Sequence, residues 1–227
     1  MNRTVNVAID GPAGAGKSTI AKKVAKTLQY IYVDTGAMFR AMAIHLIRRG
    51  TDTSDAAAIS RDAQEADITI EYRDGEQVVL LNGENVTPFL RTEDVGNMAS
   101  VSSVNPDVRT KMADLQRQLA KKQNVVMDGR DIGTVILPDA QVKIYLTASV
   151  EVRGMRRYKE LVEKGLDANL EKIEAEIRER DHRDMTRPIA PLKQADDAVF
   201  IDSSDMTIDE VTEAILAVCR EKLEQED

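Results

Sequence analysis

One octapeptide near the start of the chain constrains the fold more than any other stretch. Residues 11–18 read Gly-Pro-Ala-Gly-Ala-Gly-Lys-Ser, which fits the pattern of Gly, four residues, and Gly-Lys-Ser/Thr. An apolar run at 5–9 precedes it, and a segment with helical periodicity at 17–28 follows. Strand, glycine loop and helix in this order are typical of a P-loop, which binds phosphate groups. The alternative is a plain glycine-rich connection, which the flanking elements disfavour.

The loop also predicts specific contacts to a nucleotide. Its glycines let backbone N–H groups converge on phosphate oxygens, and the following helix N-terminus favours negative charge. We expect Lys17 to reach the β- and γ-phosphates and the Ser18 hydroxyl to coordinate Mg²⁺. The predicted ATP-binding residues are Gly11, Pro12, Ala13, Gly14, Ala15, Gly16, Lys17, Ser18 and Thr19.

Composition excludes several classes of protein. With 42% hydrophobic and 31% charged residues among 227, the chain is long enough and apolar enough for one sizeable core. No apolar run is long enough to span a bilayer, no signal peptide is expected, and a lone cysteine suits the cytoplasm. The net charge of −8 disfavours a nucleic-acid polymer as partner, whereas a small phosphorylated ligand needs only a local cluster of cations.

The order of the predicted elements indicates an α/β fold built on a parallel sheet flanked by helices. We expect strands at 5–10, 30–33, 124–127, 142–146 and 198–201. Helices are expected at 17–28, 37–49, 55–66, 106–122, 150–164 and 170–181, with a last helix capped by Thr207 and Glu210.

The alternation of strand and helix is interrupted once. Strands at 68–72 and 78–81, turns at Asp74-Gly75 and Asn82-Gly83, and a helix at 92–102 indicate a small antiparallel sheet with one helix. We therefore predict a core of 1–66 and 104–227, an insertion at 67–103 that closes over a second substrate, and a helical, arginine-rich lid near 150–187.

Polar residues follow the second and third of the predicted parallel strands. In an open parallel sheet, ligands bind outside the carboxyl ends of the strands, so Asp34-Thr35-Gly36 and Asp128-Gly129-Arg130-Asp131 are expected to meet the P-loop at one cleft. Asp128 is a candidate Mg²⁺ ligand, and a purely structural Asp that caps its loop is the alternative.

Arginines gather in the lid segment, at Arg153, Arg156, Arg157, Arg178, Arg180, Arg183 and Arg187. They could be solvated helix residues paired with glutamates. However, an enzyme that moves a phosphoryl group between two phosphates must hold two polyanions against their repulsion, and arginine supplies planar, bidentate contacts for this purpose. We therefore favour a functional cluster that closes on the nucleotide.

Four motifs together resemble the bacterial cytidylate kinase family. They are the P-loop, Asp34-Thr35-Gly36-Ala37-Met38-Phe39-Arg40, Asp128-Gly129-Arg130-Asp131-Ile132-Gly133-Thr134, and Arg180-Asp181-His182-Arg183-Asp184 with Arg187 and Ala190-Pro191-Leu192. The resemblance covers essentially the whole chain. It implies a nucleoside monophosphate kinase of pyrimidine metabolism, which transfers the γ-phosphoryl of ATP to CMP or dCMP with Mg²⁺. It also implies that the insertion is the domain that binds the monophosphate.

The resemblance assigns roles by matching position. Ser100, Arg109 and Asp131 would read cytosine, with Asp131 accepting from the amine; Thr35, Asp184 and Arg187 would lie near the sugar; Arg40, Arg130 and Arg180 would lie at the CMP phosphate. The residues implied in catalysis are Lys17, Arg153, Arg157, Arg130 and Asp128, with Ser18 and Asp128 at the metal. Phe39 departs from the motif, where Tyr is common, which loses a hydroxyl but keeps the ring.

Other functions remain open on the residues alone. A UMP kinase is the nearest rival, although uracil would place an acceptor opposite Asp131. A GTPase is disfavoured because no Asn-Lys-x-Asp segment is present. A nucleotide-dependent binding module would need the P-loop but not the acceptor residues. Nothing in the sequence indicates an assembly, so a monomer is expected.

Overall fold

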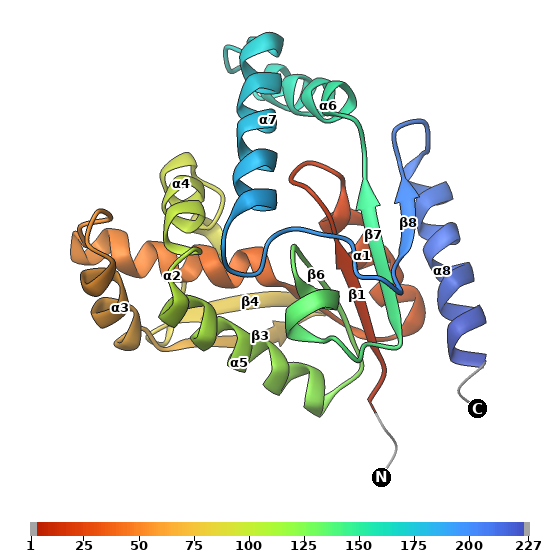
Figure 1. Ribbon diagram of the computed structural model, residues 1–227, viewed down its shortest axis with the longest axis horizontal. Coiled ribbons are helices and arrows are strands. Elements are labelled where there is room, and N and C mark those ends of the chain that lie inside the picture. Colours follow the sequence, from red (N-terminus) through yellow and green to blue (C-terminus); the bar gives the residue numbers. More distant parts are fainter. Residues whose placement is uncertain (1–3, 225–227) are drawn as a thin grey trace.

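A five-stranded parallel sheet forms the centre of the protein, in a computed structural model that describes residues 4–224 (Figure 1). The strand order is β2-β6-β1-β7-β8, and each neighbouring pair is parallel. The strands are β1 Asn6–Asp10, β2 Ile31–Asp34, β6 Val125–Gly129, β7 Val142–Thr147 and β8 Val199–Asp202. This order places β1, which leads into the P-loop, at the middle of the sheet.

Helices cover both faces of this sheet. On one face, α1 (Lys17–Leu28) and α8 (Ile208–Glu224) enclose an apolar core that includes Ile9, Ile215 and the buried Cys219. On the other face, α2 (Thr35–Arg49), α3 (Ala56–Gln64) and α5 (Pro106–Lys122) enclose a second core around Met38, Met42 and Met112. The fold class predicted from the sequence is confirmed.

The segment predicted to be a lid forms two helices, α6 (Val150–Glu163) and α7 (Leu170–Thr186), beyond the carboxyl ends of the strands (Figure 1). The 67–103 segment forms a second, antiparallel sheet of β3 (Ile68–Arg73), β4 (Glu76–Leu81) and β5 (Glu84–Asn85), followed by η1 (Thr87–Phe89) and α4 (Glu93–Ser102). Its apolar residues, among them Leu81 and Val95, join the core around α2. No helix among residues 4–224 combines the length and the apolar character that a membrane crossing needs.

Several elements differ from the prediction. Helix α2 begins at Thr35, two residues early, because the Asp34 carboxylate accepts from Ala37 N and caps the helix. Helix α7 continues to Thr186, five residues beyond the predicted end, through a charged stretch that has no apolar periodicity. A one-turn π-helix, η2 (Ile132–Ile136), follows β6 and was not predicted. The predicted Thr207–Glu210 capping box of α8 is confirmed.

Candidate functional site

The P-loop begins directly after β1 and packs closely against β7. A Cβ atom at Gly11 would lie 1.9 Å from the carbonyl oxygen of Leu146, so only glycine allows this approach. Gly16 caps α1 with φ 85°, in the left-handed region that favours glycine. The Lys17 ammonium is buried and donates to the Pro12 carbonyl at 2.7 Å. The lysine is therefore folded back across the loop, over the position where phosphates bind in a P-loop.

Burial and, to a smaller extent, the neighbouring charge of Arg130 lower the pKa of Lys17 to about 7. Burial, with help from the Asp34 carboxylate, raises the pKa of Asp128 to about 6. A lysine and a carboxylate thus share a poorly solvated site in which added phosphate charge would favour the protonated lysine.

Residues that suit a magnesium ion lie beside Lys17. Asp128 Oδ2 accepts a hydrogen bond from Ser18 Oγ at 3.1 Å, and Asp128 Oδ1 accepts one from the Tyr32 hydroxyl at 2.8 Å. Mg²⁺ prefers oxygen ligands and is commonly held by one or two protein groups together with substrate phosphates. The hydroxyl of Ser18 and the carboxylate of Asp128 therefore fit the ion that the P-loop implies.

Cations converge at the carboxyl end of β6. Burial lowers the pKa of Arg180 to about 10, and the charges of Arg130 and Arg40 act in the same direction. Burial likewise lowers the pKa of Arg40, with contributions from Arg91 and Arg130. Among residues 4–224, the Nε of Arg180 is one of the few buried side-chain atoms without a hydrogen-bond partner. These mutually repelling groups would be stabilised by an anion.

A second cluster lies around Asp131, which is buried with Arg109. Asp131 Oδ2 pairs with Arg109 Nη2, and Asp131 Oδ1 accepts from Arg187 Nη2 at 3.3 Å. The Arg109 guanidinium lies over the Phe39 ring, 5.7 Å from its centroid. Ser100 lies on α4, whose C-terminal end meets Arg109 because the carbonyl of Ser103 accepts from Arg109 Nη1 at 3.2 Å. The three predicted base-reading residues thus come from neighbouring elements.

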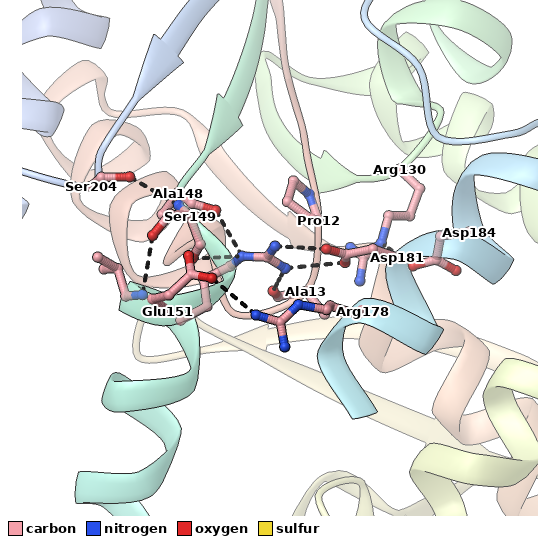
Figure 2. A network of polar contacts seen from close by, with 12 residues as sticks. Pro12, Ala13, Arg130, Ala148, Ser149, Glu151, Arg178, Asp181, Asp184 and Ser204 are labelled. Carbon is pink, nitrogen blue, oxygen red and sulfur yellow. Dashed lines mark hydrogen bonds and ion pairs between the residues drawn. The ribbon is translucent and has the colours of Figure 1, made fainter. Parts of the chain in front are cut away.

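Arg153, on α6, donates hydrogen bonds to α7 and to the P-loop. Its partners Ala13, Ala148 and Asp181 are labelled in Figure 2. Its guanidinium donates to both carboxylate oxygens of Asp181, and its Nη1 also donates to the Ala13 carbonyl at 3.1 Å. Its Nε donates to the Ala148 carbonyl at 2.8 Å. Arg153, a residue of α6, therefore connects that helix to α7 and to the P-loop.

Asp184 belongs to the same side of α7. Its Oδ2 accepts from Arg130 Nε at 2.9 Å (Figure 2). Burial alone would raise the pKa of the Asp184 carboxyl, but the charge and hydrogen bond of Arg130 lower it overall. Asp184, which was predicted to lie near the sugar, is thus in direct contact with Arg130, which was predicted to lie at the CMP phosphate.

The remaining lid arginines have other partners. Arg157 is exposed and pairs with Glu160 on its own helix, so it is not brought to the P-loop here. Arg156 donates to the Ser203 carbonyl at 3.0 Å and lines a cavity of about 330 Å³ between α1 and the start of α8. The cavity wall also includes Gly16, Thr19 and Ile208.

Sequence reasoning gave Thr35 a place near the sugar and missed three site residues. Thr35 is the first residue of α2, and its hydroxyl donates to the carbonyl of Asp128 in β6 at 2.7 Å. The missed residues are Asp10, Tyr32 and Asp181. Asp10 is the last residue of β1, and the strand-end rule that singled out Asp128 could have found it.

Comparisons with known proteins identify relatives along nearly the whole chain. A family model described as cytidylate kinase matches residues 7–221. A cytidylate kinase of Bacillus licheniformis is 48% identical over 227 residues, covering 99% of this chain and 100% of that protein. A cytidylate kinase of Ligilactobacillus salivarius is 47% identical over 222 residues, covering 98% of this chain and 99% of that protein.

Among solved structures, an uncharacterized protein from Eubacterium ventriosum superposes with a TM-score of 0.52 and 15% sequence identity. The alignment covers 95% of this chain and 97% of that chain. At this level of identity the likeness concerns the fold alone.

Proposed function

The chain belongs to the cytidylate kinase family, and on that premise we propose how its site works. The protein is a phosphotransferase that moves the γ-phosphoryl group of ATP to CMP or dCMP, giving ADP and CDP or dCDP. The acceptor is already an anionic phosphate oxygen, so the reaction needs positioning and charge stabilisation rather than a dedicated general base.

The convergence of Lys17, Arg40, Arg130 and Arg180 is the observation that carries this proposal. Burial and mutual repulsion lower the pKa values of Lys17, Arg40 and Arg180, and Arg180 Nε is buried without a partner. Phosphates of ATP and CMP would neutralise this cluster from two sides. Lys17 then serves the β- and γ-phosphates, while Arg40, Arg130 and Arg180 hold the CMP phosphate.

Base selection falls to the cluster around Asp131. Cytosine offers an amine donor and two acceptors on its pairing edge, so Asp131 can accept from the amine while Arg109 and Ser100 donate. Arg187 and Asp184 lie on the adjoining side, where Thr35, Asp184 and Arg187 would surround the sugar. The ion pairs of Asp131 with Arg109 and Arg187 support this assignment because they fix the carboxylate in place.

Ser18 and Asp128 would hold Mg²⁺. When bound, the ion neutralises charge that develops on the phosphates. The protein's own part is to present the two oxygens at the mouth of the P-loop, with Tyr32 fixing the second oxygen of Asp128.

On the donor side, the cavity beside Gly16 and Thr19 would take the adenine of ATP, with Arg156 at its wall. Arg153 reaches the P-loop already, whereas Arg157 would have to leave Glu160 to contact the transferred phosphoryl group. Both arginines thus retain the catalytic role proposed from the family, with different starting positions.

The predicted organisation forms part of the same proposal. The 67–103 segment acts as the domain that binds the monophosphate, the α6–α7 pair as the lid, and 1–66 with 104–227 as the core. Residues 1–3 and 225–227 of that core lie outside the described residues. A monomeric enzyme acting in the cytoplasm accords with the lone cysteine and with the absence of an assembly signal in the sequence.

The test is ADP formation from ATP and Mg²⁺ with CMP, dCMP, UMP, AMP and GMP as acceptors. We expect the cytidine nucleotides to react fastest, Lys17→Ala to abolish turnover, and Lys26→Ala, an exposed lysine of the same helix, to leave it unchanged. Asp131→Ala is expected to weaken the preference for cytidine nucleotides.

A binding module that only uses ATP to change shape is distinguished by thermal stabilisation. CMP raises the melting temperature of a protein that has an acceptor site, because it binds the folded state. Folded, ATP-binding protein that phosphorylates none of the five acceptors and gains no stability from CMP would refute the kinase mechanism.

A further inference from the structure

The π-helix η2 begins in an unusual way. Asp131 occupies its N-cap position, where aspartate side chains ordinarily accept hydrogen bonds from the first free N–H groups. The Asp131 side chain makes no such bond. Instead, its two oxygens pair with Arg109 and Arg187, on the side where the base would bind.

Another aspartate performs the capping. Asp10 Oδ1 accepts from Ile132 N at 2.8 Å, and Asp10 Oδ2 accepts from Gly133 N at 2.7 Å. Asp10 is 4% exposed and is the last residue of β1, directly before the P-loop. Its partner in the β1–β6 register is Gly129. One carboxylate from the central strand thus satisfies both N–H groups that follow Asp131.

This arrangement resolves a competition for one side chain. A buried N–H group without a partner costs free energy, and an N-cap carboxylate ordinarily accepts from the second or third N–H group of its helix, so without Asp10 the N–H of Gly133 would compete for the Asp131 carboxylate. A carboxylate turned toward its own helix would leave Arg109 and Arg187 and could not face a bound base.

We propose that Asp10 is a positioning residue for acceptor selection, because it caps η2 in place of Asp131 and thereby leaves the Asp131 carboxylate free to read the base. The inference rests on the proposed role of Asp131 in recognising cytosine. It also links the two halves of the site: the residue that ends the strand before the ATP-binding loop fixes the loop that selects the acceptor.

A double-mutant cycle tests this coupling, with the ratio of kcat/KM for CMP to that for UMP as the measured quantity. Asp10→Asn keeps the size of the side chain but replaces one acceptor by a donor. We expect it to lower the CMP-to-UMP ratio about tenfold, in the range for loss of a hydrogen bond to a charged group. The KM for CMP should rise by a larger factor than the Kd for ATP alone.

In the Asp131→Ala background, Asp10→Asn should lower the ratio by less than about a further twofold, because the residue through which it acts is gone. Asp62→Asn is the matched control. Asp62, on α3, is also a buried aspartate, and it accepts a hydrogen bond from Thr51 Oγ1 at 2.6 Å. Its replacement should leave the CMP-to-UMP ratio unchanged. The melting temperature of each variant is measured alongside. Asp10→Ser, whose hydroxyl can serve one N–H group, replaces Asp10→Asn if the latter does not fold.

The outcomes separate the two proposals. If Asp131→Ala leaves the CMP-to-UMP ratio unchanged, base reading by Asp131 is wrong, and the role of Asp10 falls with it. If Asp131→Ala lowers the ratio but substitution of Asp10 does not, only the inference about Asp10 is overturned. An equal loss of selectivity from Asp10→Asn in both backgrounds also overturns it, since Asp10 would then act independently of Asp131.

Discussion

Arg153 and Asp181 are joined by two hydrogen bonds, Nη2 to Oδ2 at 2.6 Å and Nη1 to Oδ1 at 3.1 Å, in a buried position between the lid and the P-loop. Removing one partner would leave the other charge buried and unpaired. We expect Asp181→Ala to lower the free energy of unfolding by about 3–5 kcal/mol, measured by urea denaturation. Glu160→Ala breaks the exposed pair with Arg157 and should cost less than about 1 kcal/mol. Equal losses from both variants would contradict a special role for the buried pair.

ATP binding should be accompanied by proton uptake above neutral pH. The pKa of Lys17 is lowered to about 7 in the free protein, and the phosphates of ATP would raise it again. Below that pH the lysine is already charged. Above it, binding must supply the proton, so the affinity for ATP should fall as pH rises from about 7 toward 9.

Titration calorimetry at about pH 8, in two buffers with different ionisation enthalpies, measures this uptake. Lys17→Arg is the control. Its guanidinium is charged at every pH used, so this variant should take up no proton when ATP binds. Buffer-independent binding heats for the unaltered protein would show that Lys17 is fully protonated before ATP arrives.

Tyr32→Phe should impair the use of Mg²⁺. The substitution keeps the ring but removes the hydroxyl that donates to Asp128 Oδ1 at 2.8 Å, which leaves one oxygen of a buried carboxylate unpaired. We expect kcat to fall about tenfold and the Mg²⁺ concentration for half-maximal activity to rise. Tyr30→Phe, at a half-buried tyrosine before β2, should change neither quantity. A Tyr32→Phe enzyme with the original Mg²⁺ dependence would show that Asp128 needs no such support.

Substitution by alanine should change the stability of the fold in opposite directions at two glycines. A Cβ at Gly129 would lie 2.6 Å from Ile132 Cδ1 and 2.9 Å from Thr35 Oγ1, whose hydroxyl is held by the Asp128 carbonyl. Gly129→Ala should therefore destabilise the fold by about 1–3 kcal/mol. Gly96 lies within α4 with no atom near its Cβ position, so Gly96→Ala should stabilise by about 0.5–1 kcal/mol. Thermal unfolding of both variants checks the pair, and a stabilising Gly129→Ala would refute the contact.

Much of the fold followed from local patterns. Apolar periodicity located α1 and α5, and the Thr207–Glu210 capping box located the start of α8. The turn dipeptides Asp74-Gly75 and Asn82-Gly83 marked the antiparallel hairpins, where all four residues have positive φ. The end of α7 and the π-helix η2 did not follow. The end of α7 has no apolar stripe, and the five residues of η2 are too few to show helical periodicity. Contacts from distant residues hold both elements: Arg130 on Asp184, and Asp10 on Ile132 N.

The place of the candidate site in the fold was predictable from the sequence, but the hydrogen-bond and ion-pair partners of its arginines were not. The strand-end rule for parallel sheets brought Asp34, Asp128 and the P-loop together correctly. The choice of partner for each arginine could not be predicted, because helical spacing says which side of α6 a residue is on and not what it meets. Arg153 and Arg157 are one turn apart, yet Arg153 reaches Asp181 and the P-loop while Arg157 stays with Glu160.

The hairpin of β3 and β4 has a consequence for the sheet edge at β2. Gln77 accepts from Asp34 N at 2.8 Å and donates to the Asp34 carbonyl at 3.3 Å, and the Tyr72 hydroxyl donates to the Tyr32 carbonyl at 3.0 Å. Side chains thus occupy backbone groups that an edge strand would otherwise offer to another chain. Removing the hairpin would therefore uncover a sheet edge that is prone to intermolecular strand pairing, a structural role for the 67–103 segment that is separate from its proposed part in binding the monophosphate.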